Sequence, residues 1–202
     1  MKIAVFLATL FTTLLPLLAS AMPVMKKPHA RDEGNGAFTV MALRSGSPIH
    51  YLPVQAGGQR FFLGGKPSTY CPTFVAKCPP GNETVFIEGV YLDTEVPGGQ
   101  QVYVNPQGAL AFTQAHSTFT PPGSSFGPFS YTPGQPYGQY SYTGQGANGF
   151  MACPDKAENP SSWQVFAAIK NATVPTGNVN DCLDFVAVTV PYNWSIPAWQ
   201  YV

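Results

Sequence analysis

Three carboxylates that could do chemistry lie close together in the chain, at Glu88, Asp93 and Glu95. Most glycosidases cleave a sugar bond with two carboxyl groups about 5 to 10 Å apart. Glu88 and Asp93 flank a short strand-forming stretch and would approach each other across a hairpin. The chain holds only ten Asp and Glu in all, so a chance cluster is the simpler interpretation. A glycan-active enzyme is therefore the least favoured function.

A G-x-S-x-G motif occurs at residues 123–127. In esterases this motif sets the serine on a tight turn between a buried strand and a helix. Here it lies between Pro122 and Pro128, with neither element beside it. His50 and His116 have no Asp or Cys nearby in the sequence, and neither is distinguishable from a surface or satisfied strand histidine. We expect no catalytic residue and no cofactor.

Four cysteines, Cys71, Cys78, Cys153 and Cys182, predict two disulfides if the chain is secreted. Three pairings can be drawn. The first two cysteines flank a six-residue segment and the last two flank a strand-loop-strand segment, so local pairing is the arrangement we expect. A zinc site is disfavoured because the chain has no C-x-x-C pair and its three histidines are widely spaced. We expect no metal.

Two kinds of residue could place carbohydrate at the protein surface, those that carry an attached glycan and those that bind one. Sequons predict N-glycosylation at Asn82, Asn171 and Asn193, each beside turn residues or at the end of a segment. Candidate contacts to bound glycan are Tyr131, Tyr137, Tyr140, Trp194 and Trp199. These rings could stack on sugars, or they could pack an insertion and a closing strand against the sheet.

The N-terminus has the pattern of a secretory signal peptide over residues 1–21. Lys2 precedes an apolar run from Ile3 to Leu18, and Ala19-Ser20-Ala21 completes a cleavage site. The run is too short for a transmembrane anchor. Residues 22–36 are charged and poor in aromatics, which predicts a flexible tail that processing could remove. Residues 37–202 then form a single domain.

Charge is scarce in this chain. Ten Lys and Arg, less Lys2 once the signal peptide is removed, face ten Asp and Glu. No basic patch is present, which excludes nucleic acid as a partner, and no membrane contact is expected after signal removal. No charged residue lies between Glu95 and Asp155. Such a neutral span suits a glycan-rich wall and is equally compatible with an ordinary β domain.

Short strands separated by Gly and Pro turns predict an all-β fold, either an antiparallel β-sandwich or a barrel-like fold, with a β-trefoil as the alternative. Residues 37–44 and 49–54 alternate in the same sense and predict a β-hairpin. Residues 84–93 predict a strand pair split at Glu88-Gly89. Residues 117–146 hold five Pro, six Gly and seven aromatic residues, which indicates an extended surface loop.

Several short blocks carry a resemblance to a known family. They are Phe38 to Tyr51, Thr84 to Asp93, Gln100 to Asn105, Gly149 to Pro154 with Trp163 to Ala167, and Asp181-Cys182. Together they resemble the PhiA-type cell-wall proteins of filamentous fungi, across nearly the whole mature domain.

The resemblance implies a secreted, non-enzymatic cell-wall protein connected with asexual development, in particular with phialides and conidia. Relatives of this kind include IgE-binding allergens. The resemblance also implies a structural pair between Cys153 and Cys182. Expected partners are wall polysaccharide or other wall proteins, and the sequence indicates no oligomeric state. The alternative function is an extracellular, lectin-like carbohydrate-binding module.

Overall fold

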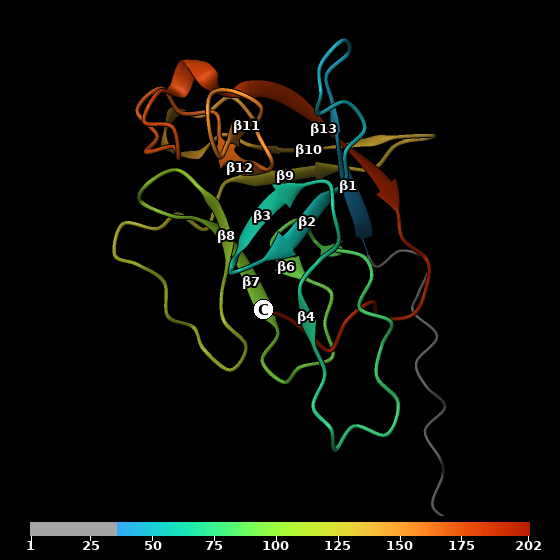
Figure 1. Ribbon diagram of the computed structural model, residues 1–202. Coiled ribbons are helices and arrows are strands. Elements are labelled where there is room, and N and C mark those ends of the chain that lie inside the picture. The colour runs from blue at the N-terminus through green and yellow to red at the C-terminus, as the bar shows by residue number, and fades with distance from the viewer. Residues whose placement is uncertain (1–35) are drawn as a thin grey trace, which may run out of the picture. The chain divides into compact units, whose positions relative to one another are not determined.

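The computed structural model describes residues 36–202, and these form an antiparallel β domain with two short 3₁₀ helices (Figure 1). The strands are β1 (Ala37–Leu43), β2 (Val54–Gly57), β3 (Arg60–Leu63), β4 (Thr69–Tyr70), β5 (Phe86–Ile87), β6 (Tyr91–Leu92), β7 (Gln100–Val104), β8 (Leu110–Phe112), β9 (Phe129–Thr132), β10 (Gly138–Tyr142), β11 (Phe150–Pro154), β12 (Trp163–Ala167), β13 (Leu183–Pro191) and β14 (Gln200–Tyr201). The 3₁₀ helices are η1 (Gly144–Gly146) and η2 (Val179–Asp181). The expected signal peptide, and the expected tail except Gly36, lie outside the described residues.

Twelve strands belong to one sheet, in the order β1-β5-β6-β7-β8-β3-β12-β11-β13-β10-β9 with β2 paired to β3. Because β1 also pairs with β13, this path of pairings closes on itself. The first residues of the long strand β13 pair with β11, and its later residues pair with both β1 and β10. The barrel-like form of the all-β prediction is therefore confirmed. Strands β4 and β14 form a separate two-stranded sheet.

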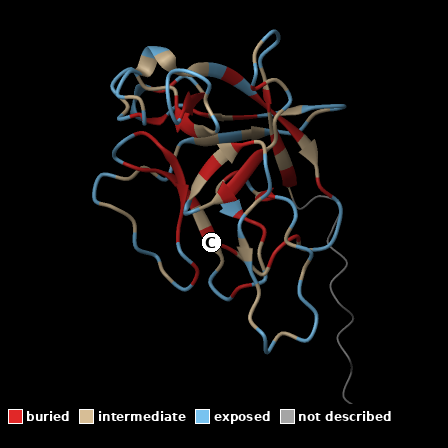
Figure 2. Cartoon of the chain, in the orientation of Figure 1, coloured by how far each residue is buried: buried red, intermediate tan, exposed pale blue. Residues whose placement is uncertain are grey.

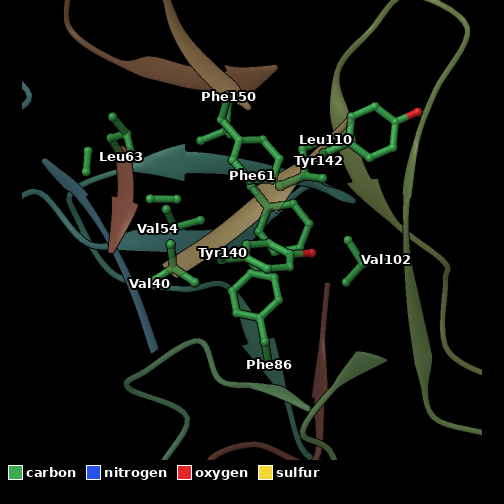
Figure 3. Packing of buried hydrophobic residues seen from close by; sticks show 14 of the residues in the cluster. Val40, Val54, Phe61, Leu63, Phe86, Val102, Leu110, Tyr140, Tyr142 and Phe150 are labelled. Atoms are coloured by element: carbon green, nitrogen blue, oxygen red, sulfur yellow. The ribbon is translucent and has the colours of Figure 1, made fainter. Parts of the chain in front are cut away.

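The interior of the barrel is filled by aromatic rings (Figure 3). The Tyr140 ring lies 5.5 Å from Phe86 and 5.3 Å from Phe150, centroid to centroid, and Phe61 packs 5.3 Å from Phe86. Each such pair contributes roughly 0.5–1.5 kcal/mol beyond the burial of its area. Figure 2 shows the consequence, since buried residues line the strands and exposed residues lie mainly on the loops.

The hairpin predicted from residues 37–44 and 49–54 forms only where the chain turns back, with Ala42 N donating to Leu52 O at 3.0 Å and Tyr51 N donating to Ala42 O at 2.8 Å. Strand β1 pairs along its length with β13, from Phe38 opposite Pro191 to Leu43 opposite Val186. The second segment contributes one bridge to β1, at Pro53, and β2 pairs with β3 instead. Proline has no N–H to donate to a ladder, and Tyr51 has a φ of 62°, so residues before Val54 turn rather than extend.

Part of the loop predicted at 117–146 is instead sheet, in the four residues of β9 and the five of β10. Strands β9 and β10 pair with each other, and β10 pairs with β13. Tyr140 and Tyr142 alternate with Gln139 and Ser141, so both tyrosines enter the core and both polar residues face outward or lie at the surface. The residues before β9 do form a loop, as expected.

Candidate functional site

The two-stranded β4–β14 sheet positions an exposed aromatic pair. Gln200 of β14 lies opposite Tyr70 of β4, and the loop that follows β4 is closed by the Cys71–Cys78 disulfide, with 6.0 Å between the Cα atoms. In Figure 1 the chain after β4 runs out to the lower edge of the domain. The disulfide ties this loop to the strand, so its tip is held near the C-terminal segment.

Phe74, at the tip of the disulfide loop, is 82% exposed. Its ring meets the half-buried ring of Trp199 edge to face, with centroids 6.4 Å apart and planes at 89°. Tyr70, immediately before the disulfide, is 52% exposed. Water-exposed aromatic surface of this kind is the usual mark of an interaction site when it is contiguous. We name Tyr70, Phe74 and Trp199 the aromatic edge.

The segment that carries Trp199 is fixed by backbone hydrogen bonds. Gly81 N donates to Pro197 O at 2.7 Å, and Val96 N donates to Trp199 O at 2.9 Å. Trp194, which precedes this stretch, is 75% exposed. The sequence prediction named both tryptophans but missed Phe74. A lone large apolar residue between two closely spaced cysteines was the available signal, because so short a closed loop has no core in which to bury it.

The three candidate tyrosines lie in different environments. Tyr137 is 48% exposed at the β9–β10 turn, and Tyr131 is half-buried with its ring stacked 3.9 Å from that of Phe38. Tyr140 is wrong as a glycan contact, because its ring is 2% exposed and its hydroxyl donates to Gly89 O at 2.6 Å. Burial raises the pKa of Tyr140 well above the ordinary tyrosine value.

Both disulfides form with the local pairing expected. The second joins Cys153 at the end of β11 to Cys182, the residue before β13, with 4.2 Å between the Cα atoms. The predicted glycosylation sites, Asn82, Asn171 and Asn193, are all exposed. Their occupancy stays a prediction.

The candidate acid pair lies apart in the hairpin. Glu88 is exposed in the β5–β6 turn with a φ of 53°, whereas Asp93 is 1% exposed and its N–H donates to Val85 O at the opposite end. In the G-x-S-x-G stretch, Ser125 donates to Gly127 O at 2.7 Å and pairs with Val104, with no helix following. The two acids are not placed as a glycosidase pair, and the serine is not placed as in an esterase.

Within residues 36–202, no group of three or more His, Cys, Asp or Glu side chains is placed to hold a metal ion. No helix of the described residues is long and apolar enough to cross a membrane.

The fold and the aromatic edge define a disulfide-braced, all-β, barrel-like protein. A model of the PhiA-like secreted protein family matches residues 38–202, and the chain belongs to that family. A curated relative from Arthroderma benhamiae, described as an uncharacterized secreted protein, is 46% identical over 200 residues, which cover 96% of this chain and 98% of the relative. No solved structure matches the chain. The family likeness seen in the sequence is confirmed, and the protein is secreted.

Proposed function

We propose that this protein is a non-enzymatic component of the fungal cell wall, retained there by contact between its aromatic edge and wall polysaccharide. The observation that carries the proposal is the Phe74–Trp199 pair, an exposed aromatic surface held in place by a disulfide and a strand. The C–H groups on one face of a pyranose ring pack well on such rings, and a pre-organised contact loses little entropy on binding.

The geometry of the two candidate catalytic motifs within residues 36–202 favours a non-enzymatic role. The best acid pair in the sequence is divided between an exposed turn and a buried strand end, so the two carboxyl groups do not face one shared sugar bond. In the G-x-S-x-G stretch, the hydroxyl groups of Ser124 and Ser125 donate to the backbone oxygens of Pro121 and Gly127. Binding and structure are the functions that remain for the surface described.

The finer proposal is a structural or developmental role in asexual structures, in phialide and conidium formation. It is supported by the resemblance to PhiA-type wall proteins, which the family match extends over residues 38–202. Deletion of the gene tests it. We expect altered conidiophores and altered wall composition, and normal conidiophores with an unchanged wall would reject the developmental role.

Retention on insoluble chitin and on β-glucan tests the wall contact. We expect the wild-type protein to be retained, and Phe74→Ser to weaken retention about tenfold, the effect of losing about 1.4 kcal/mol. Phe119→Ser is the matched control, because Phe119 is 74% exposed and lies outside the aromatic edge. No retention of the wild type on either polymer, or equal loss in both variants, would reject the proposed contact.

The second candidate function is a lectin-like carbohydrate-binding module. The exposed aromatic edge favours it too, but a lectin releases its polymer when soluble oligosaccharide competes, whereas a structural wall component stays bound through many weak contacts. Elution of the retained protein by chito- or gluco-oligosaccharides would favour the module over the structural role.

A further inference from the structure

A groove of about 230 Å³ lies on the side of the barrel formed by β3, the β7–β8 turn and β12. Its polar lining includes Arg60, Gln107 and Gln164, and its apolar lining includes Phe166 and Val174. None of its lining residues is acidic. The groove therefore offers hydrogen-bond donors beside an apolar floor, which is the combination that binds the edge and the face of a sugar ring.

One end of a glycosylation sequon forms part of this groove. Thr173, the hydroxyl residue of Asn171-Ala172-Thr173, lines it, and Thr173 N donates to Gln107 O at 2.9 Å. Ala172 packs toward Gly108, where an added Cβ would stand 3.0 Å from the Ala172 Cβ. Asn171 is exposed, and two residues of chain place its Cα at most about 7 Å from that of Thr173.

We propose that this groove holds the first N-acetylglucosamine of an N-glycan attached to Asn171. The apolar face of the sugar packs on exposed Pro175, beside buried Val174 and Phe166. Its acetamido and hydroxyl groups pair with Arg60, Gln107 and Gln164. The volume is below the roughly 300–1,000 Å³ of sites for drug-sized ligands, so it suits one ring. Attachment at Asn171 gives that ring a high effective concentration at the groove.

The other two sequons have no such environment. In the Asn82 sequon the hydroxyl residue is Thr84, which is buried and accepts a hydrogen bond from Ala56 N at 2.8 Å. Asn193 is followed by exposed Trp194 and Ser195. Neither sequon contributes a residue to the groove, so both serve as internal controls.

The first test is a thermal-unfolding cycle on secreted protein whose Asn171 glycan has been verified by peptide mass. We expect Asn171→Gln to lower Tm by about 2–4 °C, and Arg60→Met/Gln107→Ala to lower it similarly. The Gln107 backbone bonds survive that change. In the combined variant the two losses should not add, because they remove one contact. Additive losses, or an unmodified Asn171, would overturn the proposal.

A second test avoids any variant that might lose its fold. An N-glycosidase is applied to native wild-type protein, and release is followed by mass at each sequon. We expect slower release at Asn171 than at Asn82 and Asn193, with the difference abolished after denaturation. Equal native rates at all three sites would contradict a docked glycan.

Wall polysaccharide offers the same sugar chemistry, and a binding experiment separates the two sources. Chitobiose is titrated into wild-type protein and into Asn171→Gln, with chemical shifts of the Gln107 and Gln164 side-chain amides as the readout. We expect shifts in Asn171→Gln, whose groove is empty, and none in the glycosylated protein. Shifts of the same size in both would assign the groove to an external glycan and overturn the proposal.

Discussion

Tyr201 is the residue on which the most separate parts of the chain converge. Its ring is 1% exposed, and its hydroxyl donates to Glu83 O at 2.7 Å and accepts from Val85 N at 3.3 Å. Its backbone N donates to Gln100 Oε1 at 2.7 Å, and its backbone O accepts from Gln100 Nε2 at 2.9 Å. A buried polar group satisfied in this way holds its neighbours in one arrangement.

Two buried phenols, those of Tyr140 and Tyr201, make stability depend on alkaline pH. Burial is the largest cause that raises the pKa of Tyr140 and of Tyr201 in the folded protein, whereas the unfolded chain ionises near the ordinary value of 10.0. Above that pH the unfolded state holds fewer protons than the folded state. The contribution of these two tyrosines to the free energy of unfolding is therefore constant below about pH 10. Above that pH the free energy of unfolding falls by about 1.4 kcal/mol per pH unit for each tyrosine.

Denaturant unfolding of the wild type and of Tyr201→Phe from about pH 9 to about pH 11 measures this effect. We expect the decline with pH to be less steep in the variant, which loses the raised pKa of Tyr201 but keeps those of Tyr140 and Tyr131. A free energy of unfolding that stays constant to pH 11 in the wild type would contradict the prediction.

Exposure at single residues was only partly readable from the sequence. Aromatic content indicated that Tyr131, Tyr137 and Tyr140 share one biased segment, but it could not distinguish a turn residue from a core residue. The alternation of Gln139 and Ser141 with tyrosines was a strand signal, hidden by the surrounding Gly and Pro. The side of the sheet that each tyrosine faces depends on pairing with β13, which comes from almost 50 residues further along the chain.

At the scale of elements, the strands were predicted better than their partners. The strand pair at 84–93 and the strands that the second disulfide brackets occur near the expected positions. The pairing of β1 with β13 was not predictable in the same way, because local alternation fixes which residues face the core but carries no information on which distant strand lies alongside. Turn chemistry suggested a neighbour in sequence, but residues 48–51 form turns, and the one bridge to β1 is made at Pro53.

Gly138, the first residue of β10, lies where β10 packs closely against β9 and β13. Its φ is not in the left-handed region, yet a Cβ added there would collide with Thr132 O of β9 and with Thr189 Oγ1 of β13. We expect Gly138→Ala to cost about 1–3 kcal/mol of unfolding free energy, as overpacking does. Gly57→Ala is the control, because its Cβ would stand 3.5 Å from the Ser68 Cβ, an ordinary contact. Equal costs at both sites would refute the close approach.

The two disulfides should differ in what their loss does. Cys153–Cys182 spans 29 residues, so its replacement by two alanines should cost about 3–4 kcal/mol in the chain-entropy model. Cys71–Cys78 spans 7 residues and should cost about 2–3 kcal/mol, but its loss frees Phe74 and should weaken polysaccharide retention as well. Chemical denaturation and the retention assay measure the two effects. Unchanged retention without Cys71–Cys78 would mean that the disulfide does not organise the aromatic edge.

At the scale of the whole domain, the barrel and the separate β4–β14 sheet both join parts of the chain that lie far apart in sequence. Strand β1 pairs with β13 across about 150 residues, and β14 joins β4 across about 130. Such long-range pairs form only after much of the chain has lost its freedom, and they favour slow, cooperative folding. We therefore expect folding to depend on late docking of the C-terminal strands, β13 on β1 and β14 on β4.

Removing Gln200 to Val202 tests that dependence. The truncation deletes β14 and the buried Tyr201 ring. It also deletes two backbone hydrogen bonds, in which Val202 N donates to Ser68 O at 2.9 Å and Val202 O accepts from Gly58 N at 2.8 Å. Loss of a buried aromatic ring alone costs about 3–5 kcal/mol, against about 5–15 kcal/mol for an entire domain. We expect secretion to fall strongly and any secreted protein to be protease-sensitive. Val202→Ala keeps both backbone bonds, and its side chain is 40% exposed, so it should behave as the wild type. A truncated protein secreted at the wild-type level with the wild-type Tm would show that the barrel closes without its C-terminal strand.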